Sequence, residues 1–67
     1  MYIVVELQKD TNGHVANLVT EHATLAEAES KYHAVLAAAA VSETPVHSCI
    51  IVSEEGFPVA NKCYKHG

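Results

Sequence analysis

Residues 24–41, TLAEAESKYHAVLAAAAV, are the stretch of sequence that decides the fold. The stretch opens with the spacing of a capping box, in which the Thr24 hydroxyl accepts from the Glu27 amide and the Glu27 carboxylate reaches back to the Thr24 amide. Glu27 and Glu29 also place negative charge in the first turn, where the helix dipole favours it. The sequence therefore predicts a helix that begins after Thr24 and ends before Pro45, a residue that disfavours helix at the position preceding it.

The two sides of this predicted helix differ. At about 100° per residue, one apolar stripe should face a core, and it contains Leu25, Ala28, Tyr32, Val35, Leu36 and Ala39. A surface helix normally carries charge on its other side, but here the second half of that side contains Ala34, Ala37, Ala38 and Val41. We interpret these four residues as an oligomer interface. The alternative is that alanine is present only because it is the best helix former.

Strand and turn patterns flank the helix on both sides. Asn12-Gly13 between two apolar runs is a strong hairpin signal, because both residues tolerate positive φ. The predicted strands comprise residues 2–8, 15–22, 46–53 and 59–64. The order ββαββ predicts an α+β fold in a single domain, residues 1–67. We expect a four-stranded antiparallel sheet in the order 2-1-3-4, with the helix packed on one face.

The faces of this sheet follow from the alternation of side chains. A two-residue loop at Asn12-Gly13 would place Leu7 opposite Leu18 and Val5 opposite Thr20. The face turned away from the helix should then carry apolar residues from all the strands: Tyr2, Val4, Val15, Val19, Ile51 and Val59. We assign Tyr2, Val4 and Val19 to an oligomer interface on this open face.

Length and composition support association. A chain of 67 residues buries only about 60% of its unfolded surface and is marginally stable alone. Its hydrophobic content is 49%, and it contains no evident disulfide or metal framework, so homo-oligomerisation is the expected reinforcement.

The charge pattern excludes several classes of partner. The net charge is -4, and all four basic residues are lysine. Arginine supplies the bidentate contacts to phosphate and guanine, so nucleic acid is not an expected partner. No apolar run approaches the roughly 18 residues that span a membrane, and residues 1–7 lack the features of a secretory signal. We therefore expect a cytoplasmic protein without a membrane partner.

The side chains most capable of catalysis or metal binding are those of Cys49, Cys63 and His47. A second hairpin with a loop centred on Gly56 would place Cys49 directly opposite Cys63, which leaves open a disulfide, a pair of zinc ligands or two unmodified thiols. Cys49 and His47 share a strand face and could form a nucleophile and base. No oxyanion turn or metal motif accompanies them, so we expect no catalysis, no metal and no cofactor.

A ligand site is a more plausible use of the remaining polar residues. Tyr32 should face the core with a hydroxyl that seeks a partner, and His33 lies at the edge of the stripe. His47 and Ser48 open the third strand close to the end of the helix. We predict a ligand site at a subunit boundary that combines Tyr32 or His33 of one chain with His47 or Ser48 of another.

Residues 28–48, AESKYHAVLAAAAVSETPVHS, with the opening YIVVELQ and the closing CYKHG, resemble small open reading frames of phages and prophages of Gram-positive bacteria. The block AESKYHAVLAAAAVS followed by PVHS is the most specific part. The resemblance carries no established activity and no functional residues. It implies a phage accessory protein in the cytoplasm of a bacterial host. Such proteins tend to be virion or assembly factors, or counter-defence proteins, some of which sequester a host nucleotide signal.

The leading hypothesis is a non-enzymatic, homo-oligomeric phage accessory protein that binds a small molecule or a host protein at subunit boundaries. A counter-defence role would mean sequestering a host nucleotide signal or inhibiting a host protein, although the missing arginine weakens the nucleotide option. The alternative is a structural or assembly protein of the phage virion. A weaker third option is a hydrolase that uses Cys49 and His47.

Overall fold

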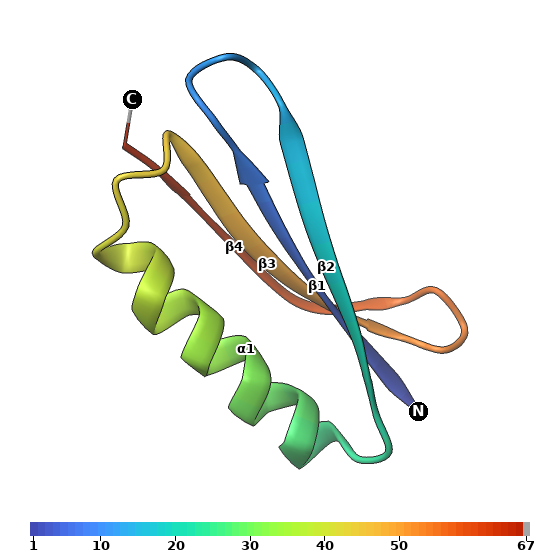
Figure 1. Ribbon diagram of the computed structural model, residues 1–67. Coiled ribbons are helices and arrows are strands. Elements are labelled where there is room, and N and C mark those ends of the chain that lie inside the picture. Colours follow the sequence, from blue (N-terminus) through green and yellow to red (C-terminus); the bar gives the residue numbers. More distant parts are fainter. Residues whose placement is uncertain (67) are drawn as a thin grey trace.

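The computed structural model describes residues 1–66, and the elements in this range follow the order ββαββ. The strands are β1 (Tyr2–Lys9), β2 (Val15–His22), β3 (Val46–Ser53) and β4 (Pro58–Lys65), and the helix is α1 (Leu25–Ala40). The strands form one antiparallel sheet in the order β2-β1-β3-β4. Helix α1 lies along one face of this sheet (Figure 1). The predicted α+β fold and strand order are confirmed.

Helix α1 begins at the predicted cap. Thr24 has extended backbone, and its Oγ1 accepts a hydrogen bond of 3.2 Å from the amide of Glu27. The Glu27 carboxylate accepts from the Thr24 hydroxyl, also at 3.2 Å, instead of reaching the Thr24 amide. The cap therefore satisfies one free amide of the first turn and ties the helix start to the turn after β2.

The core lies between α1 and the sheet. Val4, Cys49 and Ile51 are buried on the sheet side, and they meet residues of the predicted helix stripe: Ala28, Tyr32 and Val35. Tyr2 packs against the same core. Assigning Tyr2, Val4 and Ile51 to the open face was therefore wrong. The strands β1 and β3 are apolar on both faces, so alternation did not show which face the helix covers.

The first hairpin has a three-residue loop. Gly13 donates to the Asp10 carbonyl at 3.1 Å, and Asp10 donates to the His14 carbonyl at 3.0 Å. Gly13 has φ +86°, the left-handed conformation that ends this loop type. The strands consequently pair Leu7 with Asn17 and Val5 with Val19. The predicted pairing with Leu18 and Thr20 is wrong by one residue, because a three-residue loop replaces the two-residue one.

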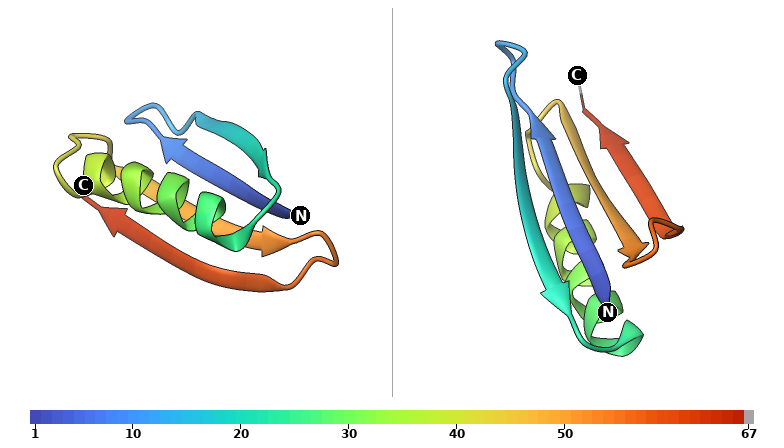
Figure 2. Two further views of the ribbon diagram at one scale, coloured as in Figure 1. Left: turned by 90° about the horizontal axis from the view of Figure 1, so that it is seen from below. Right: turned by 90° about the vertical axis from the view of Figure 1, so that its right-hand side faces the viewer.

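The second hairpin repeats this loop. Gly56 donates to the Ser53 carbonyl and has φ +89°, and Ser53 donates to the carbonyl of Phe57. A bulge between Ile51 and Val52 then shifts the register of β3 against β4. Two views of the chain show α1 on one side of the sheet, and none of the elements in residues 1–66 covers the other side (Figure 2).

Candidate functional site

A buried histidine and a half-buried carboxylate link the two central strands on the side that faces α1. His47 of β3 is 4% exposed, and its Nε2 lies 2.6 Å from Oε2 of Glu6 on β1. The same carboxylate oxygen accepts a hydrogen bond of 3.0 Å from Nε2 of Gln8. The pairings of Gln8 with His47 and Glu6 with Cys49 across the two strands bring these side chains together. The contact between Glu6 and His47 therefore joins two strands that are distant in sequence.

The second ring nitrogen of His47 lacks a partner. Nδ1 is buried and accepts or donates no hydrogen bond within residues 1–66. Leaving a buried polar atom unsatisfied costs about 1–3 kcal/mol. This cost and the partial desolvation of the Glu6 carboxylate both reduce the net stability that the contact provides.

Cys49 lies beside this pair but is not an activated nucleophile. The thiol is buried, and its pKa is raised, first by burial and second by the nearby Glu6 carboxylate. Lys31 acts in the opposite direction, with a smaller effect. A catalytic cysteine needs a lowered pKa and access to substrate, and Cys49 has neither. The arrangement of Glu6, His47 and Cys49 thus resembles a triad in residue types only.

Cys49 and Cys63 do not pair. Cys63 lies opposite Ser48, and Cys49 lies opposite Lys62. The two thiols consequently project from opposite faces of the sheet, and both are free. The predicted opposition of the two cysteines is wrong because the loop and the bulge of the second hairpin shift the register.

The unfolding free energy should fall as the pH rises above about 9. Burial raises the pKa of the Cys49 thiol above 9.0 and that of the Tyr32 hydroxyl above 10.0. As the pH rises, the unfolded chain releases these protons before the folded chain does. Each group therefore contributes its full stabilisation below its pKa in the unfolded state, and this stabilisation is lost as the pH rises through its pKa in the folded state. Urea titrations from pH 8 to 11 would measure this slope.

Substitutions identify which side chain causes each part of the fall in unfolding free energy with pH. Cys49→Ala should flatten the decline that starts near pH 9, and Tyr32→Phe the decline that starts near pH 10. Cys63→Ala, which removes an exposed thiol, should leave the slope unchanged. A slope that Cys49→Ala does not alter would contradict the assignment.

The structure does not bring the four predicted ligand residues together within one chain. Tyr32 and His47 are buried in the core, whereas His33 is exposed on α1 with its ring centroid 5.5 Å from that of Tyr32. Ser48 is half-buried and lies on the opposite face of β3 from His47. Burial removes Tyr32 and His47 from any surface that a second chain could reach directly.

The residues predicted to form an interface occupy two surfaces and the core. Ala34, Ala37, Ala38 and Val41 are exposed on α1 and just beyond it. Val19 is exposed on the open face of the sheet, whereas Val4 is 1% exposed and belongs to the core. Tyr2 is half-buried on the side of α1.

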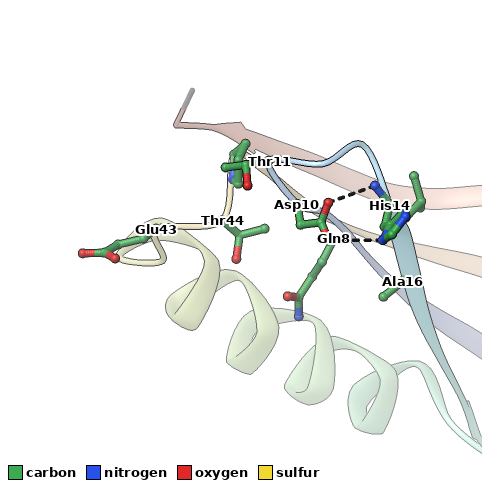
Figure 3. Close-up of a pocket in the computed structure, with 9 residues that line it drawn as sticks. Gln8, Asp10, Thr11, His14, Ala16, Glu43 and Thr44 are labelled. Atoms are coloured by element: carbon green, nitrogen blue, oxygen red, sulfur yellow. Dashed lines mark hydrogen bonds and ion pairs between the residues drawn. The ribbon is translucent and has the colours of Figure 1, made fainter.

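A pocket of about 490 Å³ lies at the end of the sheet where α1 ends (Figure 3). The loop between β1 and β2 forms one wall, and the segment between α1 and β3 forms the other. The lining residues are Gln8, Asp10, Thr11, His14, Val15, Ala16, Glu43, Thr44 and Pro45. The pocket therefore joins two loops that are about 30 residues apart in the sequence.

The polar groups of this pocket are one amide, two hydroxyls, two carboxylates and one imidazole. Asp10 Oδ1 accepts from the amides of Asn12 and His14, both at 2.9 Å, so this carboxylate organises its own loop. Thr11 and Thr44 contribute hydroxyls, and the Gln8 side chain extends toward α1 (Figure 3). Glu43 points away from the other labelled residues (Figure 3). Within residues 1–66, no lysine lines the pocket.

Sequence reasoning did not find this pocket. The sequence predicted the turn at Asn12-Gly13 and the end of the helix before Pro45, but each was treated as a connection only. The pairing of Lys9 with Val46 across β1 and β3 places the two loops at the same end of the sheet. This antiparallel arrangement was the available signal, since the predicted strand order already implied it.

Two further observations concern metal ions and membranes. Among residues 1–66, no group of three or more His, Cys, Asp or Glu side chains could hold a metal ion. In the same range, no helix is long and apolar enough to cross a membrane.

Searches of protein-family models, curated proteins and solved structures found no match to this chain. The fold and the pocket define a small α+β protein with one helix-covered and one open sheet face.

Proposed function

We propose that this chain is a non-enzymatic binding protein that acts as a homo-oligomer and holds a small polar ligand in the pocket at the end of its sheet. The pocket carries the proposal: it combines an apolar wall from Val15, Ala16 and Pro45 with hydroxyl, amide and imidazole groups. Such a mixture of apolar surface and few polar groups is typical of ligand sites.

The charge of the lining favours a neutral or cationic ligand. Asp10 is the carboxylate nearest the centre of the labelled residues (Figure 3), and the lining contains no lysine to hold a phosphate. Of the ligands expected from the sequence, a nucleotide signal therefore fits this pocket poorly. A hydroxyl-rich or amide-bearing molecule would use Gln8, Thr11 and Thr44 as partners.

The proposed biological setting is that of a phage accessory protein, in line with the resemblance in residues 28–48. Within that setting, a host small molecule or a host protein is the binding partner. A second candidate function is that of a virion or assembly factor. The exposed apolar open face, which includes Val15 and Val19, favours this second candidate because such a face can also bind another protein.

A titration with a matched pair of probes tests the ligand proposal. Adenosine monophosphate keeps the base and the 2′- and 3′-hydroxyls of adenosine and carries a charged phosphate ester in place of the 5′-hydroxyl. We expect adenosine to perturb the amide resonances of Thr11, His14 and Thr44, with weaker perturbation by the phosphorylated probe. Thr11→Val should weaken binding by about two- to tenfold, the equivalent of one neutral hydrogen bond.

The matched control is Thr20→Val. This substitution removes a hydroxyl of β2 that lies outside the pocket and is hydrogen-bonded to His22. It should leave the affinity unchanged. A pocket that responds to the phosphorylated probe alone would contradict a neutral ligand and would favour a nucleotide signal.

A further inference from the structure

The open face of the sheet, which is the face turned away from α1, is apolar along its centre. Because side chains alternate along each strand, the face opposite Val4 and Ile51 carries Ile3, Val5, Leu7, Val19, Ile50 and Val52. Val19 is 53% exposed and Leu7 is 37% exposed. An apolar surface that runs across three neighbouring strands is characteristic of an association site.

Charged residues lie at the two ends of this face, and their signs differ. Glu21 pairs with Ile3 at the end where β1 begins. Lys9 and Lys65 both lie at the other end, since they pair with Val15 and Val46 respectively. The face is therefore negative at one end, positive at the other and apolar between them.

We propose that a second copy of this chain docks on the open face, related by a two-fold axis that runs across the strands. This axis reverses the strand direction of the partner, so Lys9 of each copy lies over the end that carries Glu21 of the other. An axis along the strands would instead bring Lys9 and Lys65 of both copies together, where they would repel. The inference rests on the homo-oligomeric part of the proposed function.

The size of the face is sufficient for such a pair. Strands of eight residues are about 26 Å long, and four strands are about 19 Å wide, which gives about 500 Å² for each copy. Two copies would bury about 1,000 Å², the lower bound for a specific interface. The two sheets would stack about 10 Å apart, with strand directions within about 30° of each other. Both helices would lie on the outside of this sandwich.

The outer side of α1 is a weaker candidate for the same role. Ala34, Ala37 and Ala38 are exposed there, but each alanine offers little apolar area. Their helix propensity accounts for their presence without a partner. The open sheet face has larger side chains and a charge pattern that complements itself, so we assign the contact between copies to the sheet.

Sedimentation velocity tests the proposal by comparing substitutions at two neighbouring residues. The protein concentration should run from about 1 µM to about 1 mM, the range of dissociation constants expected for a small interface. Val19 on the open face and Leu18 on the side of α1 are 53% and 52% exposed. Val19→Lys should raise the dimer dissociation constant by about tenfold or more, because it places a charge in an apolar contact. Leu18→Lys and Ala38→Glu should leave the constant unchanged.

A charge exchange tests the orientation of the two copies. Lys9→Glu and Glu21→Lys should each weaken the dimer, and the variant with both substitutions should recover the wild-type constant. Both residues are exposed, so these variants are expected to fold, and amide spectra would verify this. Two weakened single variants without recovery in the double variant would overturn the across-strand axis.

The remaining outcomes separate this inference from the proposed function. A wild-type dimer that Val19→Lys leaves intact, or that Ala38→Glu dissociates, overturns docking on the sheet and preserves the oligomer. A chain that stays monomeric up to about 1 mM overturns both the docking and the oligomer. The ligand proposal is tested separately by the adenosine titration, which is read at Thr11, His14 and Thr44 on whichever oligomeric state is present.

Discussion

Ile51→Ala should lower the free energy of unfolding by about 2–5 kcal/mol, the range for deleting a large apolar side chain from a packed core. Ile51 is 0% exposed and belongs to the cluster that includes Val4 and Tyr32. A domain of this length has little stability in reserve, so the variant should be largely unfolded at 37 °C. Urea denaturation followed by circular dichroism would measure the loss.

Leu18→Ala is the matched control for this prediction. Leu18 lies on the same side of the sheet but is 52% exposed, so its removal should cost less than about 1 kcal/mol. Equal losses in the two variants would contradict the orientation of β3, because they would mean that Ile51 is no better buried than Leu18.

Glu6→Leu should lower the free energy of unfolding by about 2–3 kcal/mol. The substitution leaves Nε2 of the buried His47 without its 2.6 Å partner, while Nδ1 already lacks one. His47→Leu alone should cost less, because the Glu6 carboxylate remains partly exposed and keeps the hydrogen bond from Gln8. Chemical denaturation of the two single variants and the double variant would give the coupling energy.

The double variant with leucine at both positions should lie within about 1 kcal/mol of the wild type. It removes the contact between Glu6 and His47 together with the unsatisfied Nδ1, and two apolar residues can fill a similar volume. Glu29→Leu, at an exposed position of α1, should change stability by less than about 0.5 kcal/mol. A double variant as unstable as the sum of its single variants would show that the pair is not coupled.

The candidate site was much harder to predict than the fold. Glu6 and His47 are 41 residues apart, and neither belongs to a motif. The predicted ligand residues were selected as neighbours along the chain, but His47 and Ser48 lie on opposite faces of β3. The pocket depends on two loops that the antiparallel sheet brings to one end, and its lining residues are ordinary turn residues in the sequence.

Local signals in the sequence were sufficient for the elements and their order. The Thr24–Glu27 cap and the apolar stripe identified α1, and the glycines at positions 13 and 56 located both hairpins. These signals depend on residues at most a few positions apart, so they retain their meaning without knowledge of the rest of the chain. The central position of β1 followed from its apolar content in the same way.

Only the tertiary structure decided which face of the sheet α1 covers and how the strands align. Val4 and Ile51 were wrongly assigned to the open face, because β1 and β3 are apolar on both faces. The three-residue loops and the bulge after Ile51 shifted each hairpin register, and this shift separated Cys49 from Cys63. A one-residue change in register moves every later side chain to another partner, and a local pattern cannot measure it. The sequence therefore predicted that one face of the sheet is open, but only packing showed that Tyr2, Val4 and Ile51 lie on the other face.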